Sequence, residues 1–529
     1  MKRFSQLLPL VGLLLVFFYI RVHHIENLLY FVDELRHIGR AQVVWKFTDI
    51  DISTTPHKSL VYYWMGLFGL PVHLPGWLAR TSVAIFTMLG AAGTYALGRE
   101  LFSKRVGVVS LLVLSFFPFM YFFDRMALSD PLASALSVIV AWWSVVTARR
   151  PTHARSVTLG LLITFMLIAK ILTGPLIVLP MLAGALLSKN SINFKRPLKA
   201  ELLRLWGIYK PHLITFLGII GVIWGIIMGF YIIRARFSNE PASPIVNSYL
   251  YDSRGPAYNM GRFMDTLEHF WGWPLVALAL LAIAILAYRK PYHALFLWFG
   301  PVVLWGALLL VARQFTTRYI TIAGHLAVVA MVAGLFELVT WWHGRSYQRV
   351  AWLPISLLVL WVVGFGGNFW GTLIDDPLQL ELPARDQHEY FRNQTGYGLR
   401  DALYDVAARP NISENSDVPV VVGIVRNCSF LLHHIPEDLP LKVECSVYSY
   451  LHRYEWPPFG MRMRHLHQVL DAQGEVYMIV ENLSELYPML DYEMLGADAE
   501  LLKVYHRPFG GIDVEVYRLF RQKQYRIVG

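Results

Sequence analysis

The chain has 529 residues, of which 55% are hydrophobic and only 16% are charged. A soluble domain averages about 45–50% apolar and about 25% charged residues, so this composition excludes a soluble globular protein. The net charge is +10, but much of the basic excess lies in short loops between apolar runs, where it serves membrane topology. We therefore expect no nucleic-acid partner.

Long apolar runs before residue 374 predict an α-helical polytopic membrane protein with about eleven transmembrane helices, since one span needs about 20 apolar residues. The first run, 6–21, lacks a small-residue cleavage site after it and predicts an uncleaved anchor. Residues 59–75 are short, aromatic and interrupted by two prolines, which favours an interfacial or partly inserted helix over a full span. The remaining spans are expected at 78–97, 106–123, 131–147, 157–170, 172–187, 213–233, 271–288, 294–311, 319–342 and 352–373.

Alternate loops carry clusters of Lys and Arg, which the positive-inside rule assigns, with the N-terminus, to the cytoplasm. The intervening loops are then exoplasmic: 22–77, 124–130, 170–173, 234–270 and 312–318. We therefore expect a transmembrane domain at 1–373, in which 22–77 and 234–270 are the large exoplasmic loops. A soluble exoplasmic domain follows at 374–529.

The composition of this second domain is that of a small α/β fold. Apolar segments at 418–425, 475–481 and 514–520 predict strands. Helices are expected within 386–408 and at 461–472 and 484–490. Cys428 and Cys445, the two cysteines of the chain, either form a disulfide outside the cytoplasm or are two buried thiols.

The first exoplasmic loop carries a dense group of charges, which is costly beside a membrane unless it faces water, a partner or a substrate. Asp33 and Arg36 are three residues apart and share one helix face, whereas Glu34 points about 100° away. A carboxylate beside a cation stays ionised and is able to deprotonate an attacking hydroxyl. The alternative is that Asp33 and Glu34 stabilise the first turn of a helix at 33–46.

Four other charged residues stand beside predicted apolar helices. Asp130 precedes Pro131, which is a common helix start with Asp as the N-cap, and this interpretation is compatible with a role in a site. Lys58, Arg125 and Arg318 each lie at a membrane edge, where a single cation often only reaches the interface. Together they are suited to bind a phosphate, for which Arg offers a bidentate fork and Lys a point charge.

Five short motifs occur in a defined order along the chain. Val-Asp-Glu at 32–34 is followed by His-Lys-Ser-Leu-Val-Tyr-Tyr-Trp at 57–64, Arg-Met-Ala-Leu-Ser-Asp-Pro at 125–131, Ala-Lys-Ile-Leu-Thr-Gly-Pro at 169–175 and Arg-Tyr-Ile at 318–320. Over about residues 1–375 this set resembles the GT-C glycosyltransferases. The closest branch is the group of protein O-mannosyltransferases and aminoarabinose (lipid A) transferases.

The resemblance implies an inverting membrane enzyme that transfers a sugar from a polyprenyl-phosphate donor to an acceptor hydroxyl or phosphate outside the cytoplasm. The acceptor is a protein, a lipid or a glycan, and the location is the plasma membrane. By this resemblance the catalytic positions are Asp33, the base, with Glu34 and Asp130. Matching cationic positions are Arg36, Lys58 and Arg318, and with Arg125 they form the expected donor-phosphate site.

The sequence departs from the family pattern at two places. Ser59 and Leu60 stand where two prolines follow the motif lysine, and Lys170 is displaced from its place in a Thr-Lys-Gly-Pro motif. No cofactor is expected, because no His/Cys cluster has the spacing of a metal site, although a divalent cation is left open.

Two other functions compete with catalysis. The first is a non-catalytic protein that binds or transports lipid-linked glycans, and the second is a structural partner for another protein. The lack of evident intramembrane charge pairs and inverted repeats in the sequence argues against a transporter.

Overall fold

The computed structural model describes residues 8–45, 58–70, 74–193, 196–237, 255–312, 315–343, 352–392, 394–425, 429–432, 439–445, 459–481 and 498–520. The chain divides into two compact units. The first comprises Met1–Asn27 and Val43–Pro383, and the second comprises Leu28–Gln42 and Ala384–Gly529. The segment Leu28–Gln42 therefore belongs to the same unit as the C-terminal part of the chain.

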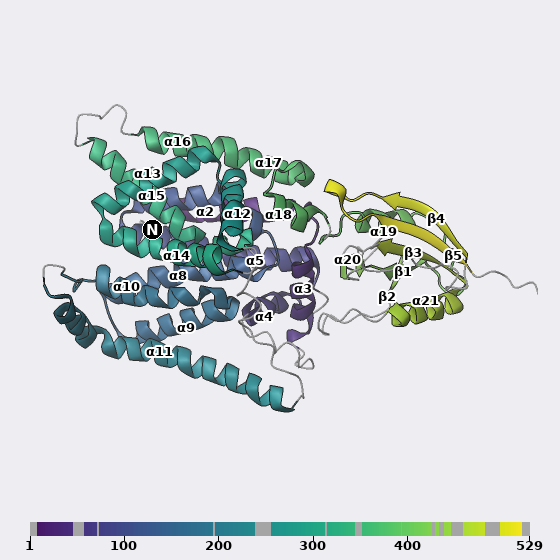
Figure 1. The fold of residues 1–529 in the computed structure, drawn as a ribbon, viewed down its shortest axis with the longest axis horizontal. Helices are drawn as coiled ribbons and strands as arrows, with labels where there is room; N and C mark the ends of the chain where they lie inside the picture. Colours follow the sequence, from purple (N-terminus) through teal and green to yellow (C-terminus); the bar gives the residue numbers. More distant parts are fainter. Residues whose placement is uncertain are drawn as a thin grey trace, which may run out of the picture. The chain divides into compact units, whose positions relative to one another are not determined.

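The first unit is built from helices (Figure 1). In chain order they are α2 (Leu8–Val22), α4 (Ser59–Phe68), α5 (Gly76–Leu101), α6 (Lys104–Phe116), α7 (Pro118–Asp124), α8 (Ser129–Arg149), α9 (His153–Ala169), η3 (Ile171–Val178), α10 (Leu179–Leu186), α11 (Leu198–Phe237), α12 (Gly255–Phe270), α13 (Trp273–Arg289), α14 (Pro291–Val311), η4 (Thr317–Ala323), α15 (Gly324–His343), α16 (Leu353–Trp361), η5 (Val362–Gly366), α17 (Gly367–Asp375) and η6 (Pro377–Gln379).

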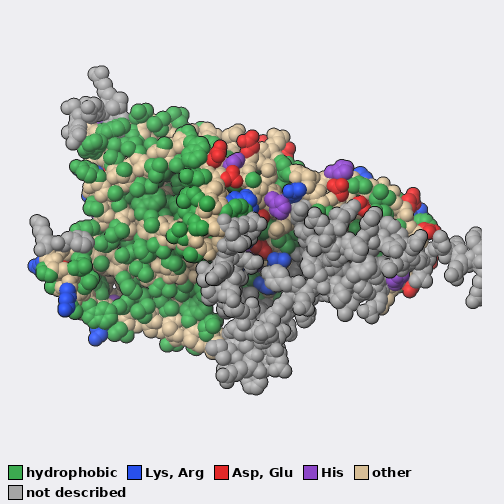
Figure 2. Space-filling model, viewed as in Figure 1, with side chains coloured by type: hydrophobic (Ala, Val, Ile, Leu, Met, Phe, Trp, Pro, Cys, Tyr) green, Lys and Arg blue, Asp and Glu red, His purple; other side chains and the backbone are tan. Residues whose placement is uncertain are grey.

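Among the described residues, 6 helical segments are long and apolar enough to cross a membrane. The number rises to 8 if two bent pairs, α6 with α7 (64°) and α12 with α13 (105°), each count as one span. Figure 2 shows that hydrophobic side chains cover most of the visible face of this unit. The protein is therefore an integral membrane protein, but the expected count of eleven spans is not confirmed.

Two details of the predicted spans can be compared with the structure. Helix α4 has 10 residues, about 15 Å, which is too short for a hydrocarbon core of about 30 Å; this agrees with the predicted interfacial helix. The expected loop at 234–270 is partly helical instead, because α11 runs to Phe237 and α12 begins at Gly255. Residues 238–254 of that loop lie outside the described residues.

The helices of this unit pack closely where small residues face each other. A Cβ atom added to Gly334 of α15 would lie 2.1 Å from the carbonyl oxygen of Ala282 on α13. A Cβ atom added to Gly90 of α5 would lie 2.7 Å from Cα of Ala135 on α8. Such close backbone approach is typical of helices packed within a membrane.

The second unit combines a mixed sheet with helices. Its elements are α3 (Val32–Val44, which continues into the first unit at its last two residues), α18 (Ala384–Gln387), η7 (His388–Arg392), α19 (Leu399–Ala407), β1 (Val420–Ile424), α20 (Ser429–Leu432), β2 (Lys442–Cys445), α21 (Phe459–Gln473), β3 (Glu475–Glu481), β4 (Asp498–Tyr505), η8 (Pro508–Gly510) and β5 (Val514–Phe520).

The strands are ordered β2-β1-β3-β5-β4. Strand β1 is parallel to β2 and to β3, whereas β5 is antiparallel to both β3 and β4. The predicted strands are confirmed as β1, β3 and β5, and the two edge strands were not predicted. The expected helix at 484–490 and Cys428 lie outside the described residues.

Alternate residues of the central strands enter two separate cores. Val421 and Ile479 pack with Leu403 of α19 and with Leu35 of α3 on one face. Val422 packs with other strand residues and with α21 on the opposite face. The α/β architecture expected from the sequence is therefore present, with helices on both faces of the sheet, and α3 is part of it.

Candidate active site

Helix α3 carries the carboxylate that the sequence predicts as the catalytic base. A hydrogen bond of 3.1 Å runs from Nη1 of Arg36 to Oδ1 of Asp33, one helical turn away. The Asp33 side chain is 21% exposed and that of Arg36 is 42% exposed. The pair thus lies on one helix face as predicted, with the carboxylate oriented by the guanidinium and accessible to a second molecule.

Glu34 points away from this pair into the protein. It is fully buried, and its Oε2 accepts a hydrogen bond of 2.9 Å from the backbone N–H of Phe31. A glutamate in the first turn that reaches back to the residue before the helix is one half of a capping box. The geometry of Glu34 is therefore that of a residue that fixes the start of α3, which is the capping alternative considered for this residue.

The chain before α3 is fixed to the second unit by backbone contacts. The N–H of Val32 donates to the carbonyl of Gln394 at 2.9 Å, and Phe31 forms an isolated β-bridge with Thr395. The ring of Phe31 meets that of Tyr390 edge-on at 5.0 Å between centroids. These contacts hold the helix start, and with it Asp33, in place on the domain formed by the C-terminal residues.

The other predicted acidic residue, Asp130, forms a buried ion pair in the first unit. Its Oδ1 accepts from Nζ of Lys170, and the two side chains are only 3% and 2% exposed. The expectation that Asp130 is an N-cap is wrong, because α8 begins at Ser129 and Leu128 is its N-cap. Asp130 lies in the first turn, where the helix dipole favours a negative charge.

Further cations gather around Lys170. Its Nζ lies 3.8 Å from the ring centroid of Tyr319, and Cζ of the buried Arg318 lies 5.6 Å from the same centroid. Arg318 and Lys58 are close enough to Lys170 to repel its charge, while Asp130 attracts it. The structure therefore brings together three of the predicted site residues, Lys58, Asp130 and Arg318, and adds Lys170 to them.

Arg125, the fourth predicted phosphate ligand, is engaged elsewhere in the same unit. It is buried, and its guanidinium donates to the carbonyls of Ile20 at 3.1 Å and His24 at 2.7 Å. Nearby, Nε of Arg21 donates to Oδ2 of Asp124 at 2.9 Å. These contacts join the end of α2 to the α7–α8 turn, so the geometry of Arg125 is that of a structural cation.

Two buried ion pairs in the apolar unit correct one expectation from the sequence. Arg21 with Asp124 and Lys170 with Asp130 are charge pairs among apolar helices, although none was evident in the sequence. A weak signal for the second pair was present, because Lys170 is the one charged residue between Arg155 and Lys189. An isolated charge in an apolar run is a candidate functional residue.

Metal ligands are not evident in the part of the chain that the structure describes. There, no group of three or more His, Cys, Asp or Glu side chains is placed to hold a metal ion. The expectation that the protein needs no cofactor stays a prediction, with a divalent cation still left open.

Comparisons of the sequence and of the structure relate this chain to known proteins. Residues 57–214 match the profile of the dolichyl-phosphate-mannose-protein mannosyltransferase family. That segment contains Lys58, Asp130 and Lys170. The structure of ArnT from Cupriavidus metallidurans in the apo state is similar over 98% of each chain, with a TM-score of 0.58 and 12% sequence identity.

The chain has the GT-C glycosyltransferase fold. The ArnT structure from the same organism bound to undecaprenyl phosphate is also similar, over 97% of this chain and 98% of that chain, with a TM-score of 0.56 and 14% identity. The GT-C resemblance seen in the sequence motifs is thus confirmed. An oligosaccharyltransferase from Archaeoglobus fulgidus matches with a TM-score of 0.48 and 11% identity, over 91% of this chain and 69% of that chain. No curated protein matches the sequence.

Proposed function

We propose that this GT-C protein is a glycosyltransferase that moves a sugar from a polyprenyl-phosphate donor to an acceptor hydroxyl or phosphate. The observation that carries the proposal is the buried Lys170–Asp130 ion pair, with Arg318 and Lys58 as neighbouring positive charges of Lys170. The similar ArnT structure with undecaprenyl phosphate supports a lipid-phosphate donor. The match of residues 57–214 to a mannosyltransferase family supports the transferase chemistry.

The cations of the first unit are proposed to bind the donor phosphate. When the bond between the anomeric carbon and the phosphate oxygen breaks, negative charge develops on the departing polyprenyl phosphate, and fixed cations stabilise it. Arg318 offers a planar fork, whereas Lys58 and Lys170 offer point charges. Asp130 holds Lys170 in place by accepting from its Nζ, which makes Asp130 a positioning residue.

Asp33 is proposed as the catalytic base. The acceptor oxygen attacks the anomeric carbon while its proton passes to the Asp33 carboxylate. The bond between the anomeric carbon and the phosphate oxygen breaks on the opposite side of that carbon, so the anomeric centre inverts. Arg36 holds the carboxylate in position at 3.1 Å. Glu34 is assigned the role of fixing the start of α3, and no metal or other cofactor is given a role.

We further propose that the protein lies in the plasma membrane with its N-terminus in the cytoplasm. The positive-inside pattern of Lys and Arg in alternate loops supports this orientation. It places the sheet domain on the exoplasmic side, where it would present or select a protein, lipid or glycan acceptor.

The test is transfer of radiolabelled sugar from polyprenyl-phosphate donors by the purified full-length protein in detergent. Asp33→Asn is expected to lower kcat at least about 100-fold, because a general base contributes about 10²–10⁴ in rate. The control is Asp401→Asn, which changes a 59% exposed carboxylate in the same unit. Equal transfer by Asp33→Asn and the wild type would show that Asp33 is not the catalytic base.

Donor binding is tested separately. Lys58→Gln is expected to raise the KM for the donor about tenfold or more, since hydrogen bonds to charged groups contribute about 1.5–3 kcal/mol. Lys104→Gln, at an exposed helix start, is the matched control. Donor binding with no transfer by the wild type would instead favour the non-catalytic lipid-linked-glycan protein.

A further inference from the structure

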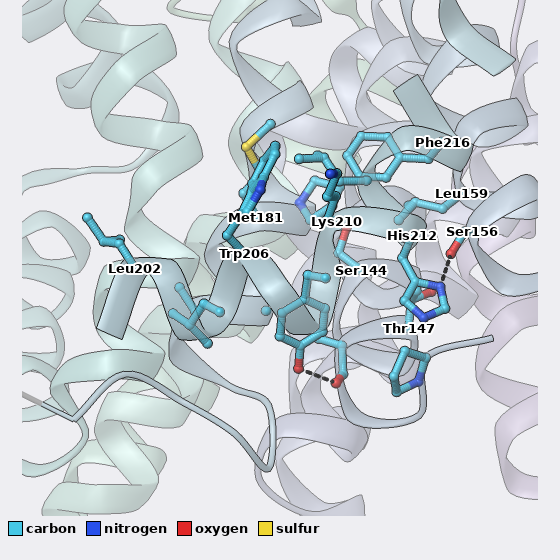
Figure 3. A pocket seen from close by; sticks show the side chains of 18 residues that line it. Ser144, Thr147, Ser156, Leu159, Met181, Leu202, Trp206, Lys210, His212 and Phe216 are labelled. Carbon is cyan, nitrogen blue, oxygen red and sulfur yellow. Dashed lines mark hydrogen bonds between the residues drawn. The ribbon is translucent and has the colours of Figure 1, made fainter. Parts of the chain in front are cut away.

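A cavity of about 250 Å³ lies among α8, α9, α10 and α11 of the first unit (Figure 3). Its walls are mostly apolar and include Leu159, Met181, Trp206 and Phe216. A cavity of this lining is suited to hydrocarbon.

The cavity lies where the surrounding helices end. Helix α8 ends at Arg149 and α9 begins at His153, while the lining residues Thr147 and Ser156 lie within one turn of those ends. Leu159 is six residues into α9, a depth of about 9 Å. The cavity therefore extends from the level of the lipid headgroups into the upper part of the hydrocarbon layer.

The sequence of helix α11 independently places this end of the cavity at the membrane boundary. It has 40 residues, about 60 Å, which is twice the hydrocarbon core of about 30 Å. Its first part, up to Lys210, carries Glu, Lys and Arg residues, and no Asp, Glu, Lys or Arg occurs between Pro211 and Ile233. Lys210 thus marks the point at which α11 enters the membrane.

Lys210 is the one Lys or Arg among the residues that line the cavity. It is exposed and forms no ion pair with any described residue. Other cations at this end of the helices do form ion pairs, as Arg149 does with Glu100 at 2.7 Å and Arg204 with Glu201 at 2.6 Å. A positive charge at the rim of an apolar cavity complements an anionic headgroup attached to a hydrocarbon chain.

The donor site is at the other end of the same helices. Asp130 lies in the first turn of α8, and Thr147, which lines the cavity, is seventeen residues further on, about 25 Å along the helix. Lys170 likewise follows the far end of α9. A lipid whose phosphate is bound near Asp130 cannot also have its phosphate at Lys210.

We propose that this cavity binds an anionic glycerophospholipid, with one acyl chain among the apolar side chains and the phosphate beside Lys210. Lys210 supplies the charge selection and the apolar walls supply the contact area. His212 lines the cavity near this rim, and its Nδ1 lies 3.1 Å from Oγ of Ser156. Figure 3 marks this hydrogen bond with a dashed line. The bound lipid would connect α11 to the α8–α9 pair in the leaflet opposite the donor site.

The test is native mass spectrometry of the full-length protein in detergent, titrated with phosphatidylglycerol or with phosphatidylcholine of the same acyl chains. Phosphatidylglycerol is expected to bind more tightly, and Lys210→Gln to weaken it about fivefold, the contribution of one basic residue near an anionic lipid. Lys189→Gln, which removes an exposed charge at the same end outside the cavity lining, is expected to change nothing.

A second pair of variants tests the cavity itself. A Cβ atom at Gly184 would lie 3.7 Å from the Tyr209 ring, so Gly184→Leu is expected to fill the space and abolish binding of phosphatidylglycerol. Gly207→Leu, on α11 with nothing within 4 Å of its Cβ position, is the control. Met181→Trp, at a 43% exposed lining residue, replaces Gly184→Leu if that variant fails to fold.

Three results would overturn the proposal. They are equal affinity for the two phospholipids, no effect of Lys210→Gln, and unchanged binding in both cavity-filling variants. A different result would assign the cavity to the prenyl chain of the donor: undecaprenyl phosphate would displace phosphatidylglycerol from the wild type, and Gly184→Leu would no longer bind undecaprenyl phosphate.

Discussion

Lys170 and Asp130, forty residues apart in the chain, form an ion pair that is almost completely withdrawn from solvent. One residue lies directly after α9 and the other in the first turn of α8, so the pair connects two helices at one end. Two opposite charges in such a place cost desolvation energy, and this energy is recovered only while both partners are present.

Removal of one partner is therefore expected to be more harmful than removal of both. Lys170→Met should lower the free energy of unfolding by about 3–5 kcal/mol, because it leaves the Asp130 carboxylate buried alone. The double variant Asp130→Asn with Lys170→Met should recover part of that loss. Thermal unfolding of the four proteins of this double-mutant cycle measures the coupling, and additive losses would show that the pair contributes no interaction energy.

Glu34 and Asp33 are adjacent but are expected to respond differently to substitution. Glu34→Gln keeps an oxygen that accepts from Phe31 N–H, so turnover should stay within a fewfold of wild type, while Glu34→Ala should destabilise the protein by about 1 kcal/mol through the lost cap. Asp33→Asn should instead lose turnover with little change in melting temperature. Loss of turnover in Glu34→Gln at unchanged stability would make Glu34 a catalytic residue.

Asp405 of α19 is expected to make the stability of the second unit depend on acid pH. Burial raises the pKa of Asp405 and is the largest single effect. The hydrogen bonds from Arg409 at 2.8 and 3.0 Å and from Tyr505, together with the positive charges of Arg409 and Lys503, outweigh it and bring the pKa below the ordinary value of 3.8. A lowered folded-state pKa stabilises the protein above the unfolded-state value, and this stabilisation is lost as the pH falls below about 4. Melting curves between pH 6 and pH 3 should converge for the wild type and Asp405→Asn at the acid end; a constant difference would contradict this account.

Close backbone packing between α13 and α15 gives a prediction about stability. Gly334→Ala should destabilise the protein by about 1–3 kcal/mol or more, because its methyl group would overlap the Ala282 carbonyl and force the helices apart. Gly306→Ala on α14, where nothing lies within 4 Å, should be neutral or slightly stabilising. Melting temperatures in detergent measure both changes, and equal values for the two variants would show that the helices adjust freely.

The features that were predicted from the sequence are those that depend on local pattern. Strand β3 has an uninterrupted apolar run at 476–480, and β5 is mostly apolar, with Glu515 and Arg518 as its charged residues. The spacing of Asp33 and Arg36 places them on one helix face whatever surrounds that helix. Edge strand β4 was missed because three of its eight residues, Asp498, Glu500 and Lys503, are charged.

The features that were missed depend on partners distant in the chain. The role of Lys170 depends on Asp130, forty residues earlier. The sequence around either residue does not indicate that the two form an ion pair. The packing of α3 on the C-terminal sheet was equally hidden, because an amphipathic helix indicates that it has a buried face but not which surface covers that face.

This packing has a consequence for how the gene can be divided. Leu35 and Tyr30 share a core with residues of α19 and of strands β1, β3 and β5, which are encoded more than 350 positions later. A fragment that begins at residue 384 would expose to water the apolar surface that these two side chains cover. A truncation before that residue would leave α3 without its hydrophobic support. The helix that carries Asp33 and the C-terminal domain thus form one folding unit. A chimera that exchanges one without the other would have to rebuild this interface.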